Sequence, residues 1–153
     1  MTLTKRTLAR YGFAVVVAAL ALAQLIPVLR ENPPVESEVP VTPEARAVLV
    51  RACFDCHSNQ TVWPWYSRVA PASWLLAKDV REGRAELNYS TWSRYSAKQQ
   101  RKLLKETLQE VDEGEMPLWI YRVGHPEARL SPADRAALQR WVDERSAALD
   151  AAP

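Results

Sequence analysis

Residues 11–29 form a run of nineteen residues without a charged side chain, bounded by Arg10 and Arg30. A helix that spans the hydrocarbon core of a bilayer needs about 20 apolar residues, so the length fits a single membrane-spanning helix. Gln24 and Pro27 suit such a helix poorly, and both lie toward its C-terminal end. No face of the segment is polar, which argues against a helix buried in the core of a soluble domain.

The residues around this run predict its orientation. Lys5, Arg6 and Arg10 precede it, and basic flanking residues tend to stay in the cytoplasm, so the rest of the chain is expected outside. A cleaved signal peptide is the alternative, because Ala21-Leu22-Ala23 has the small-x-small form of a cleavage site. The run continues beyond that site, which a signal peptide would not need. We therefore expect a retained anchor over residues 1–29.

The chain beyond the anchor is close to neutral and divides into a linker and one domain. It contains 17 basic and 18 acidic residues, so it lacks the excess positive charge that is typical of a nucleic-acid-binding domain. Residues 30–42 are expected to be a linker, because prolines and glutamates keep such a stretch extended. The domain itself is expected over residues 43–153.

This domain carries helical signals, and no stretch shows the sustained alternation of a strand. Expected helix starts are marked by Thr42-Pro43, Pro71, the capping box from Ser96 to Gln99, and Ser131-Pro132. Gly83 and Gly114 are the expected ends of the second and third helices. We therefore expect a small all-α domain of about four helices.

The two cysteines of the chain lie three positions apart, in Cys53-Phe54-Asp55-Cys56-His57. This C-x-x-C-H spacing is the pattern of covalent haem c attachment. Two thioethers can reach the fixed vinyl-derived carbons of the porphyrin from one turn of chain, and the next residue then lies below the iron. We therefore expect one covalent haem bonded to Cys53 and Cys56, with His57 as the proximal iron ligand.

Three other interpretations of the motif explain less. A thioredoxin-like redox pair also has C-x-x-C, but near a βαβ unit, and none is visible. A zinc site needs four ligands, and outside the motif only His125 remains to complete it. A plain disulfide would suit an oxidising compartment but leaves the adjacent histidine unexplained.

The second axial ligand has few candidates. Met116, the one methionine besides the initiator, precedes Pro117 directly after the third expected helix. A methionine opposite histidine raises the reduction potential, and the proline stops the helix and helps to hold the sulfur. We therefore expect Met116 as distal ligand, although a methionine that fills a gap in a core has the same sequence signature. His125 is the alternative, and it could equally be a propionate partner or an ordinary loop residue.

Further side chains are expected around the haem. Trp63, Trp65 and Tyr66 can pack on the ring or donate hydrogen bonds to propionates, and Arg84 can pair with a propionate. Ordinary core packing and a solvated surface position are the alternatives for the aromatic residues and for the arginine. The expected loops carry four tryptophans, which favours loops that wrap a large apolar group: Trp63, Trp65, Trp92 and Trp119.

A set of further segments occurs together, in this order and spacing, in one known family: Gln24-Leu25-Ile26-Pro27, Asn32-Pro33-Pro34, residues 53–59, Trp63-Pro64-Trp65-Tyr66-Ser67, Pro71 with Ser73-Trp74, Gly83-Arg84 with Leu87-Asn88 and Ser90, Glu115-Met116-Pro117, and His125-Pro126 with Ala128 and Leu130. The chain thus resembles the bacterial haem-binding domain family, small membrane-anchored monohaem relatives of cytochrome c. The resemblance implies a cytochrome c-like helical fold around one covalent haem, with His57 as proximal and Met116 as distal ligand. It also implies that Gln24 is retained in the mature chain, which supports the anchor.

The leading hypothesis for function is an electron carrier rather than an enzyme. We expect one-electron transfer in the periplasm, at the outer face of the bacterial inner membrane, with a single-pass helix as the membrane contact. If both axial positions are filled, the iron has no open site for chemistry. The rival hypothesis is a haem-based ligand sensor or a peroxidase-like enzyme with an open or labile sixth site. The sequence does not name the redox partner.

Overall fold

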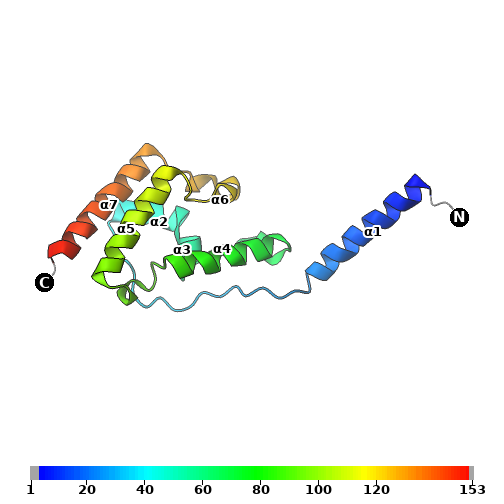
Figure 1. Cartoon of the computed structure of the whole chain (residues 1–153), viewed down its shortest axis with the longest axis horizontal. Helices are drawn as coiled ribbons and strands as arrows, with labels where there is room; N and C mark the ends of the chain where they lie inside the picture. The colour runs from blue at the N-terminus through cyan, green and yellow to red at the C-terminus, as the bar shows by residue number, and fades with distance from the viewer. Residues whose placement is uncertain (1–3, 152–153) are drawn as a thin grey trace. The chain divides into compact units, whose positions relative to one another are not determined.

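Helices account for the secondary structure of this chain. The computed structural model describes residues 4–151, and within them the only β interaction is an isolated parallel bridge between Ser37 and Thr91. The helices (Figure 1) are α1 (Lys5–Ala23), α2 (Pro43–Ala52), α3 (Phe54–His57), α4 (Ala72–Glu86), α5 (Ala97–Glu113), α6 (Trp119–Gly124) and α7 (Pro132–Ala151), with short 3-10 helices η1 (Trp65–Arg68), η2 (Trp92–Arg94) and η3 (Pro126–Ala128). The expected all-α fold is confirmed.

Helix α1 covers most of the uncharged run. Its N-cap is Thr4, whose hydroxyl accepts a hydrogen bond from the Thr7 N–H, and it ends at Ala23. The helix is long and apolar enough to cross a bilayer, and none of it is buried within the protein. The expected N-terminal apolar helix is therefore present, with properties that suit a membrane anchor or a signal sequence.

The chain divides into two compact units. One comprises the chain up to Glu31 together with Trp63–Asp79, and the other comprises Asn32–Val62 together with the chain from Val80 onward. Helix α4 contributes residues to both units.

In the first unit, the segment after α1 is fastened to the segment that contains η1. The Gln24 side chain pairs with the backbone of Ala70: the Ala70 N–H donates to Gln24 Oε1 at 2.9 Å, and Gln24 Nε2 donates to the Ala70 carbonyl at 3.3 Å. Arg30 Nη1 donates to the Ser67 carbonyl at 3.0 Å. Gln24 thus satisfies both the N–H and the carbonyl of Ala70, as a neighbouring strand would in a sheet.

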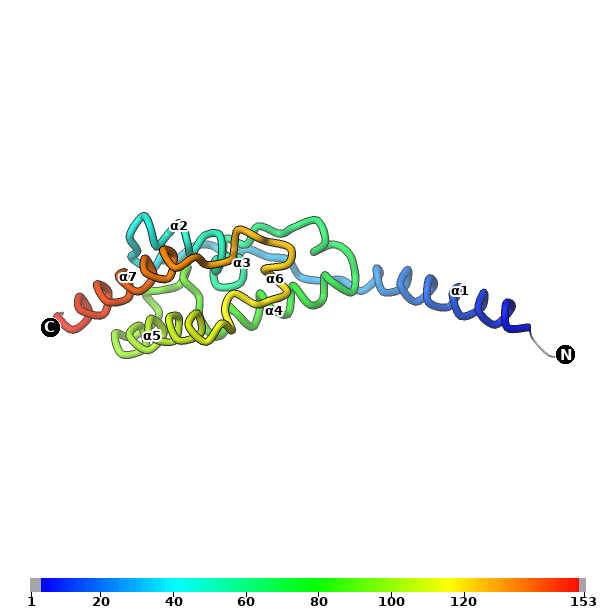
Figure 2. The backbone as a smooth tube through the Cα atoms, turned by 90° about the horizontal axis from the view of Figure 1, so that it is seen from above, coloured from blue at the N-terminus to red at the C-terminus, as the bar shows by residue number. Residues whose placement is uncertain are grey.

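The core of the second unit lies among helices α2, α5 and α7. Helix α7 packs against both α2 and α5, and α5 and α7 run side by side (Figures 1 and 2). Fully buried side chains from these three helices include Leu49, Leu104, Leu138 and Trp141. Each such side chain contributes roughly 1.5–3 kcal/mol of hydrophobic stabilisation, so the contacts among these helices hold the unit together.

An aromatic cluster extends this core. The Tyr89 ring stacks on Phe54 and on Trp92, with centroid distances of 5.8 and 6.3 Å, and meets Trp141 edge-on. Trp92 is only 4% exposed. The expectation that Trp92 belongs to a loop around a bound group is therefore wrong, because it packs inside the protein core against other aromatic rings.

Residues 32–41 run extended along this cluster. The Val39 N–H donates to the Tyr89 carbonyl at 3.1 Å, and the Trp141 Nε1–H donates to the Pro40 carbonyl at 2.9 Å. Val39 is 2% exposed and belongs to the hydrophobic core. The proline-rich segment is thus tied along its length to the helical core of this unit.

Most helix ends lie where local signals predict them. Thr42 caps α2, the capping box of Ser96 and Gln99 opens α5, and Gly114 ends α5 with a left-handed φ of 79°. The expected end of a helix at Gly83 is wrong, since α4 continues through it to Glu86. The short helices α3 and α6 have no counterpart among the four expected helices.

Candidate functional site

Cys53, Cys56 and His57 lie on one helical turn between α2 and the end of α3. The Cys53 N–H donates to the Leu49 carbonyl at 2.8 Å, so Cys53 ends α2. Its own carbonyl accepts from the N–H groups of Cys56 and His57, at 3.2 and 2.9 Å. Phe54, buried between the cysteines, fixes this turn to the aromatic cluster. We call residues 53–57 the attachment turn, because both thiols and the imidazole come from this one turn of backbone.

The His57 ring is oriented by the end of α4. Its Nδ1 lies 2.9 Å from the Gly83 carbonyl oxygen and 3.1 Å from that of Leu87. A carbonyl oxygen only accepts hydrogen bonds, so Nδ1 carries the proton and Nε2 keeps its lone pair. Burial lowers the pKa of His57, which favours the neutral ring. A histidine whose Nδ1–H is held by backbone carbonyls is the usual arrangement of a metal-ligating imidazole.

Gly83 allows the attachment turn to lie directly on α4. A Cβ atom at this position would be 2.7 Å from the Cys56 carbonyl oxygen and 3.2 Å from the Cys56 Cβ. Any side chain here would therefore force the turn away from the helix. The glycine that looks like a helix end in the sequence instead permits a close contact between two backbones.

The two thiols do not form a disulfide. Cys53 packs against the hydrophobic core, and burial raises the pKa of its thiol to about 12, with a further contribution from Cys56. A redox-active cysteine pair needs a lowered thiol pKa, so this environment argues against a thioredoxin-like function. The described residues contain no group of three or more His, Cys, Asp or Glu side chains that could hold a metal ion, so a zinc site gains no support.

These residues fit a covalently attached haem. Two thiols that form no disulfide and an imidazole with an Nε2 lone pair come from one turn of chain, and Nδ1 of the imidazole is held by backbone carbonyls. This donor set would supply two thioether bonds and one nitrogen ligand to iron.

The two candidate distal ligands come from the chain after α5. Met116 lies partly buried in the segment between α5 and α6, and its N–H donates to the Glu110 carbonyl at 3.1 Å. His125 follows α6, and its Nδ1 lies 3.1 Å from Glu127 Oε1. The His125 ring lies parallel to Tyr121 with centroids 4.2 Å apart.

Asp55, inside the attachment turn, connects that turn to α6. The Tyr121 hydroxyl donates to Asp55 Oδ2 at 2.7 Å, and the Val62 N–H donates to Asp55 Oδ1 at 2.8 Å. Sequence reasoning missed Asp55 and Tyr121 as site residues, because their partners are far away in the chain. It also missed the role of Gly83, although an isolated glycine inside a helical pattern is a signal of close packing.

Arg84, expected as a propionate partner, forms hydrogen bonds to segments next to the attachment turn. Its Nε donates to the Ser58 carbonyl at 2.8 Å, and its Nη2 donates to Thr61 Oγ1 at 2.8 Å and to Asn32 Oδ1 at 2.9 Å. Pairing of Arg84 with a propionate stays a prediction.

The expected aromatic haem contacts Trp63, Trp65 and Tyr66 belong to the first unit. Trp65 is 77% exposed and meets Tyr66 edge-on, with centroids 5.8 Å apart, while Trp63 and Tyr66 are partly buried. Trp119, on α6 in the second unit, is 68% exposed. The packing of these rings on a haem stays a prediction.

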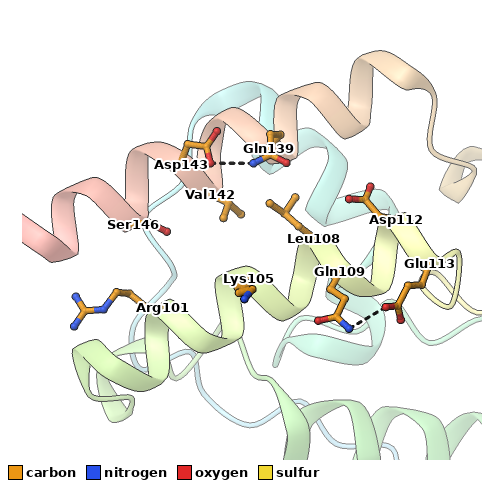
Figure 3. Close-up of a pocket in the computed structure, with 10 residues that line it drawn as sticks. All are labelled: Arg101, Lys105, Leu108, Gln109, Asp112, Glu113, Gln139, Val142, Asp143 and Ser146. Carbon is orange, nitrogen blue, oxygen red and sulfur yellow. Dashed lines mark hydrogen bonds between the residues drawn. The ribbon is translucent and has the colours of Figure 1, made fainter.

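A surface groove of about 560 Å³ lies between α5 and α7 (Figure 3). Leu108 and Val142 supply its apolar side chains, and charged groups of both signs, among them Arg101, Lys105 and Asp143, lie along it. None of the expected haem ligands lines this groove, so it adds nothing to the cofactor site.

Comparison with known proteins agrees with this chemistry. The family model described as a haem-binding domain matches residues 17–144, which is most of the chain and includes the whole attachment turn. No curated protein and no solved structure gives a significant match. On the strength of the family match, the chain belongs to the haem-binding domain family.

Proposed function

We propose that this protein is a monohaem c-type cytochrome that transfers single electrons at the outer face of the bacterial inner membrane. The observation that carries the proposal is the attachment turn. Cys53, Cys56 and His57 share one turn, and the His57 Nδ1–H is held by the carbonyls of Gly83 and Leu87. Membership of the haem-binding domain family supports the cofactor.

Three residues of the turn have distinct roles in this proposal. The Cys53 and Cys56 sulfurs would hold the porphyrin by thioether bonds, and His57 would offer Nε2 to the iron. Met116 would supply the second iron ligand, with His125 as the alternative. The bound haem supplies an iron that cycles between the ferric and ferrous states, while the chain fixes the ligands and sets the polarity around them.

The proposed location rests on α1. We propose that residues 1–29 anchor the chain by one membrane-spanning helix with its basic end in the cytoplasm. Residues 30–42 link this anchor to the haem domain of residues 43–153 in the periplasm, and Val39 of the linker packs in the core of that domain. The length and apolar composition of α1 support this arrangement. The near-neutral domain lacks the excess positive charge of a nucleic-acid-binding protein. Its partner in this proposal is a redox protein.

The experiment that tests the function is optical spectroscopy on the full chain, produced together with the haem c maturation system. We expect haem that survives a denaturing gel, and a six-coordinate low-spin spectrum in both oxidation states that changes little with carbon monoxide. A five-coordinate high-spin ferrous spectrum that responds readily to carbon monoxide would favour the rival ligand sensor or peroxidase-like enzyme. A colourless protein with free thiols would overturn the proposal altogether.

A further inference from the structure

The segment that follows Met116 is fastened to the attachment turn by a hydrogen bond between two partly buried side chains. Tyr121 on α6 donates its hydroxyl proton to Asp55 Oδ2 at 2.7 Å. Asp55 Oδ1 accepts the Val62 N–H at 2.8 Å, so a bond to each oxygen holds the carboxylate in place. A tyrosine hydroxyl is protonated at neutral pH, so Tyr121 can donate this bond.

A second connection holds the same segment a few residues later. The His125 ring lies parallel to Tyr121, with an interplanar angle of 8°, and its Nδ1 lies 3.1 Å from Glu127 Oε1. The Glu127 carbonyl accepts from Arg51 Nε on α2 at 3.0 Å. Helices α6 and η3 are thus held against α2 and α3 at two points, Asp55 and Arg51.

The other end of the Met116 segment is held to the helical core. Helix α5, which precedes it, packs against α7, and Arg135 Nη1 of α7 donates to the Val111 carbonyl near the end of α5 at 2.5 Å. Only a short stretch after Gly114 separates this fixed end from α6. The contact of α6 with the attachment turn therefore fixes the second end of the segment that carries Met116.

We infer that the Tyr121–Asp55 hydrogen bond positions the distal side of the haem site and keeps the Met116 sulfur on the iron. This inference rests on the proposed function, in which Met116 is the sixth ligand. Tyr121 is a positioning residue, because it acts through the attachment turn and α6. Without its hydroxyl, α6 would be held to the turn less tightly, and Met116 would be available to a bound iron for less of the time.

The test uses the full-length holoprotein with Tyr121→Phe, which removes the hydroxyl and keeps the ring on His125. The first readout is the weak far-red charge-transfer band of methionine-ligated ferric haem. The second is the rate at which cyanide binds to the ferric protein. A lost hydrogen bond to a charged group opens the site about 10-fold more often, so we expect cyanide to bind about 10-fold faster in the variant, with a weaker far-red band.

The matched control is Tyr89→Phe, which removes a tyrosine hydroxyl that is hydrogen-bonded to Thr107 on α5, at 3.1 Å, and not to the attachment turn. It reports the general cost of losing such a hydroxyl. A double-mutant cycle makes the test specific: Tyr121→Phe should have almost no further effect on the cyanide rate in an Asp55→Ala background, because both changes break the same bond.

The outcomes separate the inference from the function on which it rests. Faster cyanide binding in Tyr121→Phe alone, abolished in the Asp55→Ala background, supports the inference. If the wild-type protein shows the far-red band and Tyr121→Phe changes neither readout, or no more than Tyr89→Phe does, the inference is wrong while the proposed cytochrome stands. If the wild-type protein holds haem but lacks the band, Met116 is not the ligand, and both the distal assignment and the inference fail.

Discussion

The carbonyl oxygen of Gly83 accepts a hydrogen bond from His57 Nδ1 at 2.9 Å, and the absent side chain of the same glycine leaves room for the Cys56 backbone. One residue of α4 thus positions the imidazole and admits the thiol-bearing turn. The arrangement explains why a residue that usually weakens helices lies inside this one.

Replacing Gly83 with alanine should therefore damage the site although alanine favours helices. The new Cβ would meet the Cys56 carbonyl oxygen at 2.7 Å, and backbone cannot easily move aside. We expect a loss of about 1–3 kcal/mol in the free energy of unfolding and less haem attached per chain. Denaturant unfolding and haem staining measure the two effects. Arg81→Ala, on an exposed part of the same helix, is the control, and equal behaviour of the two variants would contradict the close-contact explanation.

Single cysteine variants should separate attachment from ligation. With Cys53→Ala or Cys56→Ala one thioether is lost, while His57 keeps its hydrogen bonds to Gly83 and Leu87 and can still ligate iron. We expect haem with one remaining vinyl group, recognised by a red-shifted pyridine haemochrome spectrum, and lower yield. The double variant should lose haem on a denaturing gel. Unchanged covalent haem in both single variants would show that the thiols are not the attachment points.

Signals that act within one turn of the chain predict the local structure correctly. The starts of α2 and α5 and the end of α5 follow from Thr42, the Ser96–Gln99 capping box and Gly114, because each signal acts on the backbone within one turn. The C-x-x-C-H spacing likewise predicts that the two thiols and the imidazole share one turn.

Contacts between distant residues could not be read in the same way. Continuation of α4 through Gly83 depends on what packs there, and the sequence does not show that the Cys56 backbone does. The Tyr121–Asp55 bond joins residues 66 positions apart and leaves no periodic pattern. Trp92 looks like a loop residue in the sequence because its burial depends on an aromatic cluster in which Tyr89 contacts Phe54 and Trp141, both distant in the chain.

The choice between the two distal ligands can be decided by a pair of variants. Met116→Ala should leave the haem attached but convert the iron to a high-spin or ligand-accessible form, because the sixth position is then empty. His125→Ala should change the spectrum much less, because in this proposal Met116 and not His125 is the sixth ligand. Absorption spectra of both ferric proteins measure this. A spectrum altered by His125→Ala and not by Met116→Ala would reverse the assignment.

Gln24 should hold the segment after α1 against the segment around Ala70 in the first unit. Its amide satisfies both the N–H and the carbonyl of Ala70, and Gln24→Ala leaves both groups without this partner. We expect faster proteolysis within Trp65–Arg68, about 5-fold for the loss of roughly 1 kcal/mol. Leu25→Ala is the control, because that side chain is 76% exposed. Equal cleavage rates in the two variants would show that the pairing does not hold the segment.

Protonation of Asp134 should make the protein less stable in acid, over a defined range of pH. Its Oδ1 lies 2.6 Å from Arg51 Nη2, and its Oδ2 accepts from the Ser131 N–H at 2.9 Å and the Ser131 hydroxyl at 2.8 Å. The Arg51 side chain first, and then the Ser131 groups, lower the pKa of Asp134 from 3.8 to about 2.

A lowered pKa means that the folded protein binds the proton less readily than the unfolded chain does. The stabilisation by Asp134 is therefore fully present above the unfolded pKa of 3.8 and is lost as the pH falls through about 2. We expect Asp134→Asn to cost about 1 kcal/mol at neutral pH, after allowance for the partly exposed pair, and progressively less below about pH 4. Thermal unfolding of both proteins between neutral and acidic pH measures this convergence. Asp143→Asn, whose exposed carboxylate accepts from Gln139 on the same helix, is the control and should change the melting temperature little. A difference between wild type and Asp134→Asn that stays constant down to low pH would show that the ion pair with Arg51 does not stabilise the fold.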